Sequence, residues 1–123
     1  MSTDRKPASV YGVGSEPDPR FSLANERTAL AWVRTGLALV AGGVALTTLG
    51  ALADAGAILD VIAAFSCIAG AVLAIGALWS WRRAERALRM QQPLPAPAML
   101  PVLVTGIAVI GLAMAAYAVL QVL

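Results

Sequence analysis

The sequence predicts an all-α membrane protein with three transmembrane helices, and three observations support this prediction. Charged residues make up only 13% of the 123 residues, whereas soluble domains carry about 25%. Apolar residues make up 59%, and the mean hydropathy is +0.78. Three stretches carry no charged residue, namely 35–53, 61–81 and 90–123. Each has close to or more than the roughly 20 helical residues that cross a hydrocarbon core of about 30 Å.

The uncharged stretches predict spans over about 28–53, 58–81 and 98–123, all within one transmembrane domain over 18–123. A soluble helical bundle is disfavoured because residues 63–75 are apolar on every side, whereas a surface helix needs a polar face. Spanning strands are disfavoured because a barrel needs at least eight of them.

The stretch before the first span has a different composition. Residues 1–17 are polar and contain Ser, Gly and Pro, so we expect a disordered N-terminal segment. Asp18 followed by Pro19 is typical of a helix start, with Asp as the capping residue and Pro in the first turn. We therefore expect a short interfacial helix from Pro19 that leads into the first span.

The charged residues of the loops indicate the orientation of the spans. The loop after the first span carries Asp54 and Asp60 and no basic residue. The loop after the second span carries four arginines, which are Arg82, Arg83, Arg86 and Arg89. Because basic residues beside spans remain cytoplasmic, we expect the N-terminus inside and Leu123 outside.

The three tryptophans agree with this orientation. Trp32 opens the first span, and Trp79 and Trp81 close the second, so all three fall at the predicted inner boundary. Tryptophans at a membrane boundary form an aromatic belt at the headgroup level. We therefore interpret the three tryptophans and the four loop arginines as topology and lipid-headgroup anchors.

Small residues recur at four-residue spacing within the predicted spans, as in Ser66, Gly70 and Ala74. Such spacing lets helices approach closely in lipid, where packing drives association. Three helices bury little of one another, and we therefore expect a homo-oligomer.

Arg20, Arg27 and Arg34 are spaced by seven residues, so they lie on one helix face and about 10 Å apart along its axis. Arg34 falls inside the first span, where an arginine usually faces protein or a water-filled cavity. The alternative is that Arg34 extends back to the inner headgroups, and both interpretations stay open at this point.

In an oligomer arranged around a symmetry axis, one arginine from each copy would form a ring. Stacked rings of Arg27 and Arg34 would form a basic funnel, and arginine rings are one way to select anions. Glu26 is the nearest acidic residue, and we expect it either to pair with Arg82 or Arg83 or to remain solvated at the interface.

Little in the sequence indicates catalysis. The chain has no His and one Cys, which leaves neither the commonest general base nor a thiolate cluster for a metal. We expect no catalytic residue, metal site, cofactor or nucleic-acid partner. A proton-coupled carrier is also disfavoured, because no acidic residue lies deep in a span.

The stretch 18–39 carries a longer motif. It reads Leu-Ala-Asn-Glu-Arg-Thr at 23–28 and Leu-Ala-Trp-Val-Arg-Thr at 30–35, and an apolar helix with the pair Gly42-Gly43 follows. This pattern resembles the signature of the YidH-type family of small inner-membrane proteins, also called domain of unknown function 202. That family is similar to the membrane domain of the vacuolar transporter chaperone complex, which makes polyphosphate and passes it across a membrane.

The resemblance implies a multi-pass protein of the bacterial inner (plasma) membrane that assembles into a ring. It implies that Arg27 and Arg34 face a polyanion path, with Glu26 as a pairing or gating partner, and it is less informative about Arg20. A pentamer and a trimer are both open, and the pentamer is favoured by analogy with the eukaryotic relatives.

The function that we favour is a basic central path for inorganic phosphate or polyphosphate in a small homo-oligomeric membrane protein. The alternative is a non-transporting scaffold or accessory subunit that binds membrane lipids and a partner protein. An efflux carrier of the small multidrug type is disfavoured, because such carriers use an acidic residue in the first span and this chain has Arg34 there.

Overall fold

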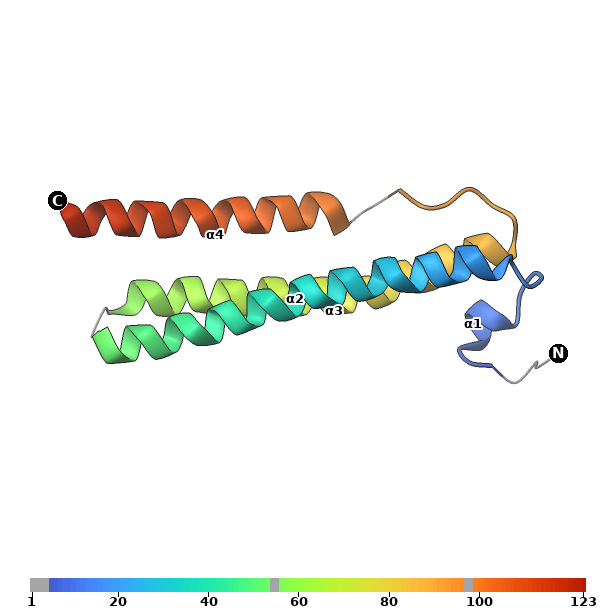
Figure 1. Cartoon of the computed structure of the whole chain (residues 1–123), viewed down its shortest axis with the longest axis horizontal. Coiled ribbons are helices and arrows are strands. Elements are labelled where there is room, and N and C mark those ends of the chain that lie inside the picture. Colours follow the sequence, from blue (N-terminus) through green and yellow to red (C-terminus); the bar gives the residue numbers. More distant parts are fainter. Residues whose placement is uncertain (1–4, 54–55, 97–98) are drawn as a thin grey trace.

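The computed structural model describes residues 5–53, 56–96 and 99–123, and every regular element in them is a helix. The elements are α1 (Ala8–Tyr11), α2 (Pro19–Ala53), α3 (Ala57–Arg89) and α4 (Met99–Val122). Figure 1 shows α2 and α3 side by side along the long axis, with α4 beside one half of them. α2, α3 and α4 are each long and apolar enough to cross a membrane, which confirms the predicted fold class.

The helix boundaries agree with the predicted spans and extend two of them. The spans predicted over 28–53 and 58–81 lie inside α2 and α3, and the span over 98–123 corresponds to α4, although residue 98 lies outside the described residues. The expected interfacial helix is not a separate element. α2 runs without a break from Pro19, because neither Gly nor Pro interrupts residues 20–35.

The start of α2 has the predicted cap. The backbone N–H of Arg20 donates a hydrogen bond to Asp18 Oδ1 at 2.9 Å, which satisfies one of the free donors of the first turn. The Arg20 guanidinium also pairs with the other carboxylate oxygen of Asp18 at 2.9 Å. Pro19 occupies the first helical position, where its missing N–H costs nothing.

α3 continues beyond the predicted span and ends in a tight turn. Gln91 adopts a φ of 55°, and the backbone N–H of Gln92 donates to the carbonyl oxygen of Ala87 at 2.9 Å. This bond occupies a carbonyl that the last helical turn leaves free. Pro93 and Pro95 follow, so the chain cannot resume a helix at once.

α2 and α3 form an antiparallel pair whose contact surface repeats every seven residues. The buried residues of α2 are Gly36, Gly43 and Gly50, each seven positions after the one before. The facing residues of α3 alternate at four- and three-residue spacing, namely Leu59, Ala63, Ser66, Gly70, Leu73 and Ala77. A repeat of 3.5 residues per turn is the pattern of left-handed coiled-coil packing.

The glycines bring the two backbones together. A Cβ atom added to Gly36 would lie 2.7 Å from the carbonyl oxygen of Gly70, so no side chain fits there without movement. Ser66 Oγ donates to the carbonyl oxygen of Leu39 at 2.7 Å across the same contact. The expected close packing of small residues therefore includes Ser66 and Gly70, whereas Gly42 faces open space.

α4 is the least covered of the long helices. Within the described residues it packs against α3 and not against α2, and none of its residues is buried. The closest approach that a glycine of α4 offers is at Gly106, where an added Cβ would lie 3.9 Å from Ala69 Cβ. Most of the α4 surface is therefore free for lipid or another chain.

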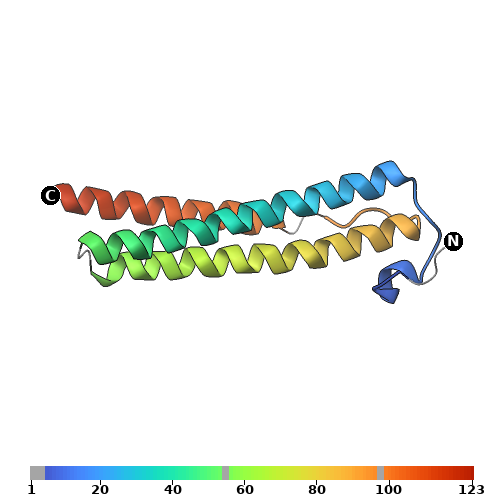
Figure 2. The same ribbon diagram turned by 60° about the horizontal axis from the view of Figure 1, so that its bottom comes forward.

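For the N-terminal segment, where we expect disorder over 1–17, the structure describes residues 5–17; residues 1–4 lie outside the described residues. α1 lies against the end of α3 (Figure 2), and Val10 is 1% exposed. The N–H of Ser15 donates to the carbonyl oxygen of Arg89 at 3.0 Å. Composition did not reveal this contact, because it depends on a few residues that meet the exposed end of a distant helix.

Candidate functional site

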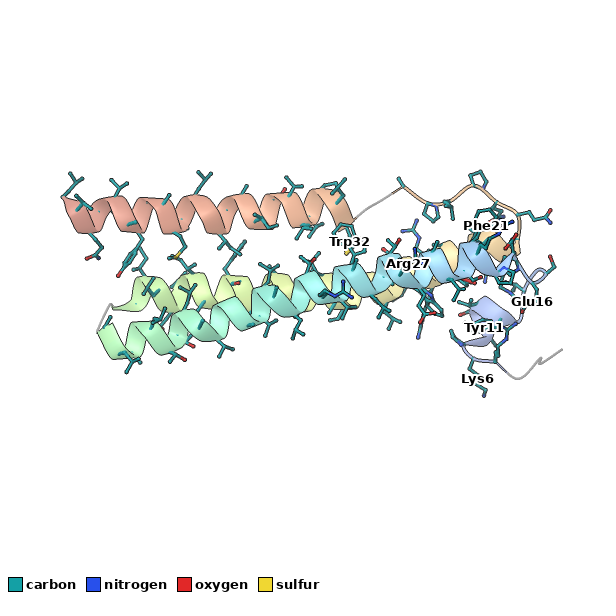
Figure 3. All side chains as sticks on the ribbon, viewed as in Figure 1. Lys6, Tyr11, Glu16, Phe21, Arg27 and Trp32 are labelled. Atoms are coloured by element: carbon teal, nitrogen blue, oxygen red, sulfur yellow. The ribbon has the colours of Figure 1, made fainter. Side chains whose placement is uncertain are left out.

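Arg20, Arg27 and Arg34 form one row along α2, and all three are exposed. Figure 3 marks Arg27 on this helix. Arg34 precedes Gly36 by two residues, which turns its side chain by about 200° from the face that packs on α3. The row therefore points away from the rest of the chain. We call these three residues the arginine row.

The members of the arginine row differ in their partners. Arg20 pairs with Asp18, and the Arg20 guanidinium holds the pKa of that carboxyl below its usual value of 3.8. Arg27 and Arg34 make no hydrogen bond or ion pair with any side chain in the described parts of the chain. These two cations are therefore available to a ligand, to headgroups or to another chain.

Glu26 does not pair with Arg82 or Arg83 within the described chain. The ion pairs there join Arg5 and Arg89 to Glu16, and Arg20 to Asp18. Glu26 is exposed and lines a shallow groove between α2 and α3, on the side of the pair that includes Leu30 and Leu78.

Glu85 is a buried acid that sequence reasoning did not single out. It is 4% exposed and accepts hydrogen bonds from Ser22 Oγ at 2.6 Å and from Asn25 Nδ2 at 3.1 Å. The Asn25 amide also donates to the carbonyl oxygen of Trp81 at 3.1 Å. Ser22 and Asn25 occupy the heptad positions that face α3, and this register was the signal in the sequence that could have predicted the contact.

The four arginines expected as anchors have different environments. Arg82 and Arg83 are exposed, and Arg86 donates to the carbonyl oxygen of Ser9 at 2.7 Å. Arg89 is 6% exposed and belongs to an internal cluster. It donates to the carbonyl oxygens of Val13 at 2.9 Å and Tyr11 at 3.2 Å, and it pairs with Glu16 at 3.0 Å.

Comparison with known proteins identifies the family. A family model described as Domain of unknown function (DUF202) matches residues 20–87, which is more than half of the chain. The chain belongs to the DUF202 family. It is also similar to two proteins of Mycobacterium tuberculosis, uncharacterized protein MT2333 of strain CDC 1551 / Oshkosh and uncharacterized protein Rv2272 of strain ATCC 25618 / H37Rv. Each is 38% identical over 108 residues, which cover 78% of this chain and 79% of the relative. No solved structure matches the chain.

The DUF202 match coincides with the α2–α3 pair. It contains the arginine row, Glu26 and the buried Glu85 with its two donors. Arg89, the N-terminal segment and α4 lie outside it. The candidate site of this DUF202 protein is therefore carried by the two helices that the family model describes.

The tryptophans of the DUF202 region gather toward one end of the pair. Trp79 is 65% exposed, whereas Trp32 and Trp81 are half-buried. The ring of Trp81 lies 6.3 Å from that of Tyr11, so it also contacts the N-terminal segment. Of the three, Trp79 has the exposure that a headgroup anchor requires.

The exposed charged groups of the site are Glu26 and several arginines. In the described part of the chain no group of three His, Cys, Asp or Glu side chains is placed to hold a metal ion. The exposed cations Arg27, Arg34, Arg82 and Arg83 are donors without acceptor capacity. Such side chains can donate hydrogen bonds to an anion, to a lipid headgroup or to a carboxylate of another chain.

Proposed function

We propose that this DUF202 protein is a homo-oligomer in which Arg27 and Arg34 of each copy face a common axis and form a basic path for inorganic phosphate or polyphosphate. The observation that carries the proposal is the position of the arginine row. It lies on the face of α2 opposite the contact with α3, and Arg27 and Arg34 have no partner within the described residues.

The depth of Arg34 adds an energetic argument. Val33, Gly36 and Leu37 surround it in the span predicted over 28–53. Placing an arginine at the centre of a lipid-exposed helix costs about 2.5–3.5 kcal/mol on insertion scales, and less near the boundary. A water-filled axis shared by several copies avoids this cost, and anions that occupy it balance the repulsion within the ring.

The surface of α2 on either side of the arginine row suits contact between neighbouring copies. One side has small residues at alternating four- and three-residue spacing, namely Ala24, Thr28, Ala31, Thr35, Ala38, Gly42 and Ala45. The other side has larger apolar residues, namely Leu23, Leu30, Leu37 and Val44, all more than half exposed. Small residues on one helix accept large ones from the next, so α2 helices can stand side by side around an axis.

Such a ring is heterologous, because each copy offers its small side to one neighbour and its large side to the other. The membrane gives every copy the same orientation, which favours closure into a ring. The motif at 18–39 resembles the YidH-type family, and the similarity of that family to the membrane domain of the vacuolar transporter chaperone complex favours a pentamer over a trimer by analogy. It also supports a bacterial inner-membrane location with the arginine end cytoplasmic, in agreement with the basic loop.

Native mass spectrometry of the protein released gently from its membrane tests the subunit number and the bound mass together. We expect one ring size and retained phosphate in the wild type. Arg34→Ala should keep the ring and lose the phosphate, and phosphate flux into liposomes should fall at least tenfold. Arg20→Ala is the matched control, because Arg20 belongs to the same row but pairs with Asp18 outside the span. Unchanged flux in an intact Arg34→Ala ring contradicts the proposal.

A further inference from the structure

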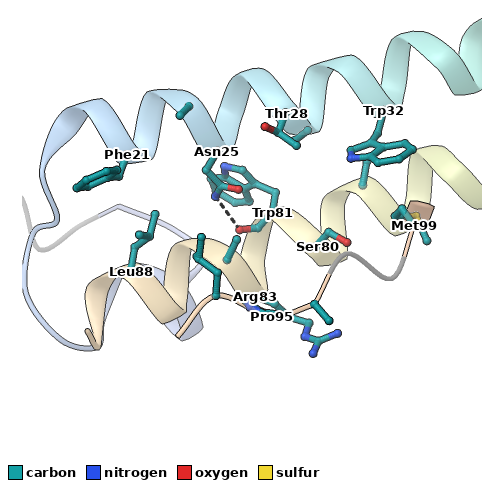
Figure 4. Close-up of a pocket in the computed structure, with 16 residues that line it drawn as sticks. Phe21, Asn25, Thr28, Trp32, Ser80, Trp81, Arg83, Leu88, Pro95 and Met99 are labelled. Atoms are coloured by element: carbon teal, nitrogen blue, oxygen red, sulfur yellow. Dashed lines mark hydrogen bonds between the residues drawn. The ribbon is translucent and has the colours of Figure 1, made fainter. Parts of the chain in front are cut away.

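The α2–α3 pair has a groove on each side at its arginine-rich end. One of them, which we call the linker groove, has a volume of about 300 Å³ and lies between α2, α3, residues 94–96 and Met99 (Figure 4). The shallow groove that contains Glu26 lies on the opposite side. Ala29, Ala77 and Trp81 contribute to both, so the two grooves are separated only by the contact between the helices.

The linker groove is apolar and has a cation at its edge. Phe21, Trp32, Leu88 and Met99 are among its lining residues, and Arg83 lies on its α3 side. In Figure 4 the Arg83 side chain extends past Pro95 to the outside of the groove. Arg83 has no hydrogen bond or ion pair in the described segments of the chain.

Glu26 and Arg83 lie at almost the same height along the pair. Asn25 bonds to the carbonyl oxygen of Trp81, and Glu26 shares its groove with Trp81. Arg83 is two residues beyond Trp81, a rise of about 3 Å. Glu26 and Arg83 carry opposite charges at almost the same height, but they lie on opposite sides of one chain and cannot pair within it.

We infer that the linker groove binds a second copy of this chain, with Glu26 of the neighbour paired to Arg83. The inference rests on the proposed ring and adds the contact that would hold it. Two copies with the same membrane orientation, set side by side, bring the Glu26 side of one against the Arg83 side of the other at matching depth. Leu30 lies beside Glu26 in the shallow groove. In the contact, Leu30 of the neighbouring copy therefore enters the apolar linker groove next to the ion pair. The contact joins different surfaces, as a closed ring requires.

Disulfide trapping in native membranes tests the contact directly. The sole native cysteine is removed with Cys67→Ala, and Glu26→Cys is combined with Arg83→Cys. We expect mild oxidation to give a ladder of cross-linked chains that ends at the ring size, because each copy contacts two neighbours. Glu26→Cys with Arg82→Cys is the matched control, since Arg82 is exposed and adjacent but does not line the groove. Its cross-linking should be at least fivefold lower.

Charge exchange tests the pairing without relying on a reactive cysteine. Glu26→Arg and Arg83→Glu should each weaken association on the order of tenfold, and the double variant should recover it, because close interfacial charge pairs couple strongly. Arg82→Glu with Glu26→Arg should not recover it. Recovery of association in the double variant also shows that each single variant lost association through its changed charge and not through misfolding.

The outcomes separate the contact from the proposed function. A wild-type ring with no Glu26–Arg83 cross-link and no recovery overturns this contact and leaves the anion path standing. A wild-type monomer that carries phospholipid, lost on Arg83→Gln, assigns the linker groove to lipid and overturns both. A ring with cross-linking and recovery that binds no phosphate supports the contact and contradicts the anion path.

Discussion

Ser22 donates a hydrogen bond of 2.6 Å to Glu85 across a separation of 63 residues, and this bond joins the arginine-rich ends of the two long helices. Asn25 adds a second donor to the same carboxylate at 3.1 Å. The carboxylate is buried and both donors are neutral, so its loss leaves Ser22 without this partner and Asn25 with the Trp81 carbonyl oxygen alone.

Glu85→Ala should therefore lower the free energy of unfolding by about 1–3 kcal/mol, because the half-buried donors Ser22 and Asn25 lose a charged acceptor. Thermal unfolding in a mild detergent measures the change. Arg82→Ala is the control, since Arg82 is exposed on the same helix, and it should shift stability by less than about 0.5 kcal/mol. Equal effects of the two changes would show that Glu85 does not hold the helices together.

Gly36→Ala should destabilise the α2–α3 pair by about 1–3 kcal/mol, since the added methyl group meets the Gly70 carbonyl. Gly111→Ala in α4 provides the comparison, because a Cβ there has no atom within 4 Å. It should be neutral or slightly stabilising through helix propensity. Resistance to a non-specific protease reports both, and a destabilised Gly111→Ala would contradict the exposed position of that glycine.

Arg89→Ala should release the N-terminal segment from the end of α3, because Arg89 binds Tyr11, Val13 and Glu16 together. Trypsin should then cut after Arg5 at least tenfold faster than in the wild type. Arg82→Ala removes an arginine that makes none of these contacts, and its cleavage rate at this site should stay unchanged. Rapid cleavage of the wild type would argue against the folded segment.

The Asp18 carboxyl should titrate below its usual pKa of 3.8, because Arg20 binds its charged form through both the guanidinium and the backbone N–H. A lowered folded-state pKa gives stability that is present above the unfolded value and is lost as pH falls through the folded one. The first turn of α2 should therefore fray in strong acid. Carboxyl NMR shifts follow the titration, and Arg20→Ala should raise the pKa toward 3.8.

The sequence was sufficient for the helices but not for their contacts. Long uncharged stretches predict spans because the bilayer imposes their length, and the Asp18 cap follows from local chemistry. The seven-residue row of Gly36, Gly43 and Gly50 is present in the sequence, but an Ala- and Gly-rich chain offers several such rows. The facing surface of α3 determines which of these rows packs against it.

The polar contacts depend equally on distant partners. Arg89 looks like Arg82 in the sequence, since both follow the second span, but one is buried and the other exposed. The difference arises from Glu16 and the carbonyl groups of a segment more than seventy residues earlier in the chain. Glu85 was overlooked for the same reason, because its donors lie on another helix.

The lengths of α2 and α3 have a mechanical consequence. At 1.5 Å per residue, 35 and 33 residues measure about 52 and 50 Å, which exceeds a hydrocarbon core of about 30 Å by roughly 20 Å. α4, with 24 residues, has much less excess and lies beside the half of the pair that ends at Ala53 (Figure 1). The parts of α2 and α3 beyond the hydrocarbon core thus form a stiff helical pair that projects on one side of the bilayer. Its tip carries α1, which packs against the end of α3 and is therefore held at a fixed height outside the hydrocarbon core.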